Sequence, residues 1–125
     1  MNSITEAKRH IDNAKQILRE KAFKENGYYQ DSEYVKIAGQ TAYTGILLAL
    51  DDFLGKKGKG LKNVDWYKQH LEKWDKKIFN SFSTAHQVLF LDMAYNGVNS
   101  VELATTGFVE AEKIIGWLEN QTAIA

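Results

Sequence analysis

SEYVKIAGQTAYTGILLALDDFL, residues 32–54, is the segment around which we expect the rest of the chain to fold. Apolar residues recur in it at three- and four-residue steps, the spacing of one face of an α-helix. This face comprises Val35, Ala38, Ala42, Ile46, Ala49 and Phe53. A second apolar set covers much of the remaining circumference: Tyr34, Ile37, Tyr43, Leu47, Leu50 and Leu54. A helix that is apolar nearly all round has neighbours on several sides, so we expect residues 32–54 to form a largely buried central helix.

The same segment contains a ridge of small side chains formed by Gly39, Ala42, Gly45 and Ala49. A glycine inside a helix costs about 1 kcal/mol relative to alanine. We therefore expect another helix to pack closely against this ridge. The continuously apolar run 46–50 is much shorter than the ~20 residues of a transmembrane helix, so we expect no membrane association.

Composition points to one domain over residues 1–125 and to a non-exported protein. The chain has 125 residues, of which 44% are hydrophobic, so it can bury a proper core. Cysteine is absent, which removes disulfides, thiolate metal sites and thiol nucleophiles and fits a reducing cytosol. The N-terminal residues are polar and lack the apolar core of a signal peptide. We therefore expect a cytoplasmic location.

Charge argues against nucleic acid as a partner. Sixteen basic and sixteen acidic side chains cancel, so no global field attracts nucleic acid or an anionic membrane. Only Arg9 and Arg19 are arginines, although arginine is the preferred bidentate ligand of phosphates and bases.

The sequence predicts four further helices and short loops. Ser3 and Glu6 form a capping box, which predicts a first helix over 4–25 ended by Gly27. Ser32 is the expected cap of the central helix, and Gly55 its C-terminal glycine. Proline is absent, which favours an all-helical chain.

The second half continues the helical pattern. A third helix is expected over about 64–80, capped by Asn63 or Asp65, and a fourth from Ser83 to Asn96-Gly97. The segment 80–84 separates them, or else both form one kinked helix. Asn99 begins a second capping box and predicts a last helix to about residue 120. Short loops make sequential helices antiparallel neighbours, so we expect an all-α, up-and-down bundle of four to five antiparallel helices.

The histidines do not form a recognisable metal motif. His10, His70 and His86 lie on three different predicted helices, and none has a glutamate three residues before it, as di-iron bundles require. No HExxH or His-x-His occurs. We expect no metal, no cofactor and no catalytic residues, with the histidines partly exposed.

Asp51-Asp52 is unusual because it lies at the C-terminal end of the central helix, where the helix dipole disfavours negative charge. Adjacent helical residues point about 100° apart, so the two carboxylates do not face one site. One interpretation is a single carboxylate positioned at a groove. The other is charge pairing with Lys56 or Lys57.

The loop GKKGKG, residues 55–60, is a candidate anion-binding loop through Lys56, Lys57 and Lys59. It lacks the GxxxxGK[ST] pattern and follows a helix, whereas a P-loop follows a strand. The alternative is a solvated turn.

Aromatic residues cluster around the start of the central helix. Tyr28, Tyr29 and Tyr34 form a candidate interface. The alternative is that they complete one edge of the core.

Three segments resemble the helices of HEPN-type bundles: AKRHIDNAKQIL, residues 7–18, GQTAYTGILLALDDFL, residues 39–54, and GFVEAEKIIGWLEN, residues 107–120. The chain is similar to small bacterial HEPN-like helical-bundle proteins. This resemblance implies a bundle of four or five helices that is frequently dimeric. It further implies a role as an RNase in toxin–antitoxin, defence or RNA-processing systems, or as a non-catalytic partner of a nucleotidyltransferase.

The chain departs from the motif of the RNases of that superfamily, an arginine followed four to six residues later by histidine. Arg9 is followed at once by His10, and no histidine lies near Arg19. The pair that would supply acid–base chemistry and hold phosphate is missing. We therefore expect a non-catalytic cytoplasmic interaction module that forms a homodimer or binds another protein. The alternative is a HEPN-type RNase or a nucleotide-binding partner of a nucleotidyltransferase.

Overall fold

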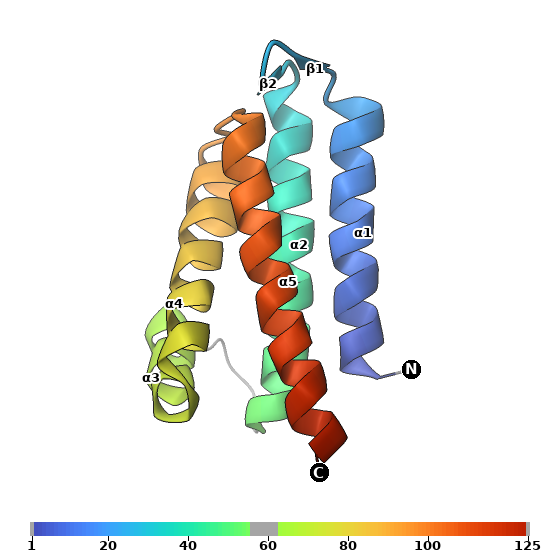
Figure 1. Cartoon of the computed structure of the whole chain (residues 1–125). Coiled ribbons are helices and arrows are strands. Elements are labelled where there is room, and N and C mark those ends of the chain that lie inside the picture. The colour runs from blue at the N-terminus through green and yellow to red at the C-terminus, as the bar shows by residue number, and fades with distance from the viewer. Residues whose placement is uncertain (1, 56–62, 125) are drawn as a thin grey trace.

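The computed structural model describes residues 2–55 and 63–124, with side chains up to Thr122, and its described part is almost entirely helical (Figure 1). The elements are α1 (Ser3–Lys21), β1 (Lys24–Glu25), β2 (Tyr28–Tyr29), α2 (Ser32–Leu54), α3 (Val64–Trp74), α4 (Lys76–Ala85), the π-helix η1 (His86–Tyr95) and α5 (Val101–Ile124). The chain runs up α1, down α2, up through α4 and η1, and down α5, with the short α3 beside α4 (Figure 1). The prediction of an all-α fold is confirmed.

The helix α2 is central, as expected. It packs against α1 on one side, η1 on another and α5 on a third, and Ala42, Ile46 and Leu50 are fully buried. The small side chains on α2 allow this close packing: a β-carbon on Gly45 would come 2.5 Å from that of His10 in α1. Gly39 makes the equivalent approach to η1.

α2 has neighbours on several sides, as expected, but one side of it faces outward although it carries apolar residues. Ile37 is 48% exposed and Leu48 is 43% exposed. The helices α1 and η1 flank α2 without closing over the side between them.

A β-hairpin replaces the end of the predicted first helix. The helix α1 ends at Lys21, and β1 then pairs antiparallel with β2. Asn26 and Gly27 form the two-residue turn with φ of 51° and 84°, the positive values that favour Asn-Gly in hairpins. The hairpin is fastened to the beginning of α5, because the Tyr29 amide donates to the Asn99 carbonyl over 2.8 Å.

The predicted N-caps of three helices are wrong by one residue. The observed caps are Asn2, Asp31 and Ser100, whose side-chain oxygens accept from the amides of Thr5, Glu33 and Leu103 at 2.8, 3.1 and 3.1 Å. Asn99 instead donates its side-chain amide to the Tyr29 carbonyl. The predicted cap at Asn63 is confirmed, since it accepts from the Trp66 amide.

The break between the third and fourth helices lies at Asp75, not in 80–84. Asp75 ends α3 and caps α4 by accepting from the Lys77 amide at 2.7 Å. The helix continues through Ser83, whose hydroxyl donates to the Phe79 carbonyl. It then widens into η1, and it stops at Gly97 with φ of 66° as predicted. A ten-residue π-helix is unusual, because most π segments are single turns.

Candidate functional site

The candidate anion-binding residues Lys56, Lys57 and Lys59 lie outside the described residues. The proposed pairing of Asp51 or Asp52 with Lys56 or Lys57 falls on the same segment.

The three candidate interface tyrosines differ in exposure. Tyr28 is 54% exposed on β2. Tyr29 and Tyr34 are partly buried against the core, and burial raises the pKa of Tyr29 above its ordinary value. Tyr28 is therefore the member of this group that is open to a partner.

The two aspartates at the end of α2 have different partners, as the angle between adjacent helical residues requires. The Tyr67 hydroxyl donates to Asp51 at 2.5 Å, and the Ser3 hydroxyl donates to Asp52 at 2.8 Å. Burial raises the pKa of Tyr67, and so does the hydrogen bond to Asp51. The pair thus joins α2 to α3 on one side and to α1 on the other.

The three histidines are separated on α1, α3 and η1. His10 and His70 each bring Nδ1 to 2.8 Å from the backbone oxygen four residues earlier, on Glu6 and Trp66. Among residues 2–55 and 63–124, no group of three or more His, Asp or Glu side chains is arranged to hold a metal ion.

His86 is the most distinctive of the three. Its ring stacks on Phe90 with centroids 5.6 Å apart and on Phe82 at 6.5 Å, and the ring of Tyr43 lies 5.8 Å away. Burial lowers the pKa of His86, and the positive charge of Lys68 lowers it further. This environment favours the neutral form of the imidazole.

The outward side of α2 is distinguished by its lack of charge. No charged residue occurs between Lys36 and Asp51, although 26% of the chain is Asp, Glu, Lys or Arg. We define the α2 face as Ile37, Gln40, Thr44 and Leu48, which are exposed and lie within one sector of the helix.

Two neighbouring elements extend the α2 face. Phe90 of η1 is 38% exposed and packs on Tyr43 with ring centroids 5.1 Å apart. On the other edge, a shallow hollow of about 340 Å³ opens where His10 of α1 meets the α2 face. The surface offers apolar contact and neutral hydrogen-bonding groups.

The periodicity of α2 could not identify this face. Ile37 lies on an apolar sector, which a core helix and an interface helix share. The available signal was the charge-free run itself, because charged residues are depleted at the centres of interfaces.

None of the helices within residues 2–55 and 63–124 combines the length and the apolar character that a membrane span requires. Residues 2–120 match the sequence profile of a domain of unknown function, DUF5618. A solved structure, a protein of unknown function from Dyadobacter fermentans, is 51% identical in sequence and superposes with a TM-score of 0.90. The match covers 96% of this chain and 95% of that one. A search of curated proteins finds no significant match.

Proposed function

The chain belongs to the DUF5618 family of domains of unknown function, and we propose that it acts as a small, non-catalytic interaction module that pairs with a second copy of itself. The α2 face is the observation that carries this proposal. Apolar side chains exposed on a charge-free surface are typical of the centre of a protein interface.

We further propose that this module is a HEPN-like bundle and acts in the cytoplasm as one domain. The sequence resemblance in α1, α2 and α5 supports the first point, together with the direction of α1, which runs antiparallel to both α2 and α5 (Figure 1). The absence of cysteine supports the second.

The test is the oligomeric state of the full chain, measured by size-exclusion chromatography with light scattering. We expect a dimer, and we expect Leu48→Asp to convert it to a monomer because it buries a carboxylate in the interface. Val109→Asp on α5 is the matched control, because Val109 is also 43% exposed, and it should remain dimeric. A wild-type monomer at high concentration, or a dimer that survives Leu48→Asp, would refute the proposal.

A second candidate function is that of an RNA-acting enzyme. His86 favours it, because its burial favours the neutral imidazole, the form that a general base requires. Metal-independent cleavage of RNA that is lost in His86→Ala would establish this function in place of the first. Intact RNA after incubation with the wild-type chain would exclude it.

A further inference from the structure

A groove of about 440 Å³ lies between α1 and α5 at the end of the molecule that carries the hairpin. This volume falls within the range of small-molecule sites, about 300–1,000 Å³. Its apolar lining, which we call the floor, comprises Leu18 of α1, Tyr29 of β2, and Phe108 and Val109 of α5. The floor thus presents two aromatic rings from different elements.

The rim of the groove is positively charged. Lys15, Arg19 and Lys24 line it together with one carboxylate, Glu112. Lys15 pairs with Glu112 at 3.2 Å, and within residues 2–55 and 63–122 neither Arg19 nor Lys24 has an ion-pair partner. A chain of zero net charge therefore places two unneutralised cations beside one apolar pocket.

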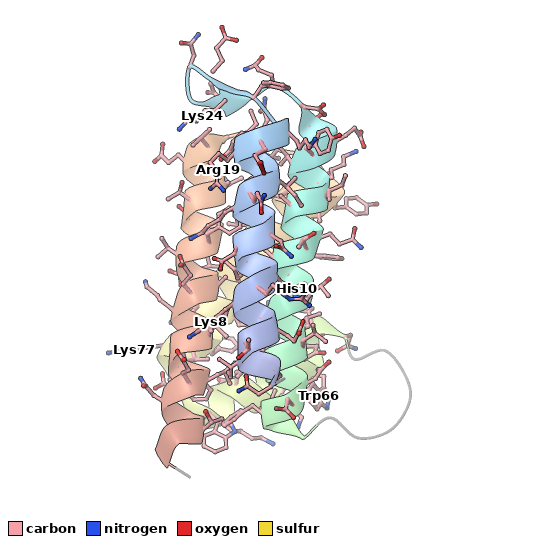
Figure 2. The ribbon with its side chains drawn as sticks, turned by 90° about the vertical axis from the view of Figure 1, so that its right-hand side faces the viewer. Lys8, His10, Arg19, Lys24, Trp66 and Lys77 are labelled. Atoms are coloured by element: carbon pink, nitrogen blue, oxygen red, sulfur yellow. The ribbon has the colours of Figure 1, made fainter. Side chains whose placement is uncertain are left out.

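The fold holds these cations together. Arg19 lies in the last turn of α1, and Lys24 pairs with Tyr29 across the hairpin. The hairpin is fixed over α5 because Tyr29 and Asn99 exchange hydrogen bonds of 2.8 and 2.9 Å. Figure 2 shows Arg19 and Lys24 at the same end of α1, on the side of α5.

One aromatic ring of the floor, that of Phe108, already lies beneath a cation, the ammonium group of Lys15. The Lys15 ammonium lies 5.8 Å from the centre of the Phe108 ring, a distance at which a cation is attracted to an aromatic face. The flat aromatic ring of a ligand in the groove would contact Phe108 and Tyr29. An acidic group on the same ligand would contact the cations of the rim.

We propose that this groove binds an aromatic anion, a small molecule that joins a planar ring to a carboxylate or phosphate. The guanidinium of Arg19 and the ammonium of Lys24 hold the acidic group, since arginine forms paired hydrogen bonds with either oxyanion. Tyr29 and Phe108 hold the ring. Both parts of the ligand are needed, because the cations alone are exposed to water and the apolar floor alone is small.

This site is separate from the proposed dimer surface. The groove lies between α1 and α5, whereas the α2 face lies on the other side of α1 (Figure 2). The two proposals can therefore fail independently.

The test is isothermal titration calorimetry of the full chain with four probes. Indole-3-acetate and adenosine monophosphate combine a ring with a carboxylate or a phosphate; indole and inorganic phosphate supply one part each. We expect saturable binding of at least one aromatic anion, at least about tenfold tighter than indole or phosphate alone. The carboxylate and phosphate arms identify which acid the groove prefers.

Two charge-matched double variants locate the site. Arg19→Gln with Lys24→Gln should weaken binding at least about tenfold. Arg9→Gln with Lys21→Gln removes the same charge from residues that do not line the groove and should bind within about twofold of wild type. Val109→Asp should weaken binding roughly fivefold or more by repulsion, while Leu48→Asp should not.

Four results would overturn the proposal: no saturable binding of either aromatic anion, phosphate bound as tightly as adenosine monophosphate, wild-type affinity in the Arg19/Lys24 variant, or equal losses in both double variants. Thermal melts of each variant establish that it is folded, so a loss of binding reports on the groove.

Discussion

Gly39 of α2 lies directly against the backbone of Leu89 in η1: a β-carbon on Gly39 would come 2.5 Å from the Leu89 carbonyl oxygen. The same position would bring it 2.7 Å from the Met93 β-carbon. Backbone atoms cannot turn aside as a long side chain can, so this contact fixes how closely the two helices approach.

Gly39→Ala should therefore lower the free energy of unfolding by about 2–3 kcal/mol, the upper part of the range for overpacking. Gly116→Ala is the matched control: a β-carbon on Gly116 meets nothing within 4 Å. In that open position alanine should stabilise the helix by about 0.5–1 kcal/mol. Urea denaturation of the two variants measures both changes in unfolding free energy. Equal changes would contradict the conclusion that Gly39 is needed for the close approach of α2 and η1.

Removal of the Tyr67 hydroxyl should destabilise the joint between α2 and α3. Tyr67→Phe deletes the partly buried hydrogen bond to Asp51, and we expect a loss of about 1–2 kcal/mol in unfolding free energy. Ser3→Ala deletes the exposed bond to Asp52 and should cost less than about 0.5 kcal/mol. Urea denaturation measures both losses of unfolding free energy. A larger loss for Ser3→Ala than for Tyr67→Phe would show that burial of the hydrogen bond does not determine how much it stabilises the fold.

Stability should fall on acidification in part because of His86. Its pKa in the folded chain lies below the ordinary value, so between the two values the unfolded chain binds more protons, and stability is lost as the pH falls through that interval. His86→Phe keeps an aromatic ring and removes the titrating group. Its unfolding free energy should decline less than that of wild type from pH 7.5 to pH 5, and parallel declines would exclude His86 as a source.

Sequence spacing predicted the helices well where one apolar face is buried. The central position of α2 followed from Ala42, Ile46 and Leu50, and Gly55 and Gly97 ended their helices as expected, with φ of 68° and 66°. Backbone geometry at such glycines is local and is therefore encoded locally.

Three features were not predicted from the sequence, each for its own reason. The hairpin was missed although Asn26-Gly27 is a hairpin signal, because Ala22 continues the apolar spacing of α1 and is fully buried. The polar residues 80–84 suggested a break in the helix. The helix is continuous there, because the Ser83 hydroxyl donates a hydrogen bond to the Phe79 carbonyl of the preceding turn. The α2 face was not predicted because the sequence does not distinguish an exposed isoleucine, such as Ile37, from a buried isoleucine.

The groove between α1 and α5 also could not be predicted from the sequence. Arg19, Lys24 and Phe108 come from three elements, which the packing of α1 on α5 and the fastening of β2 to Asn99 bring together. Nothing in the sequence distinguishes Arg19 and Lys24 from the other basic residues of a chain with zero net charge.

The wide winding of η1 affects how the family can vary in length. A π-helix bonds each amide to the carbonyl five residues earlier, one more than in an α-helix, so loss of a single amino acid from residues 86–95 would let this segment rewind as an ordinary helix. If the lost amino acid lies between Leu89 and Tyr95, Leu89 still meets Gly39, while Tyr95 rotates around the helix axis to a new direction. Relatives should therefore tolerate a one-residue gap inside this helix, where alignments of helical proteins rarely place one.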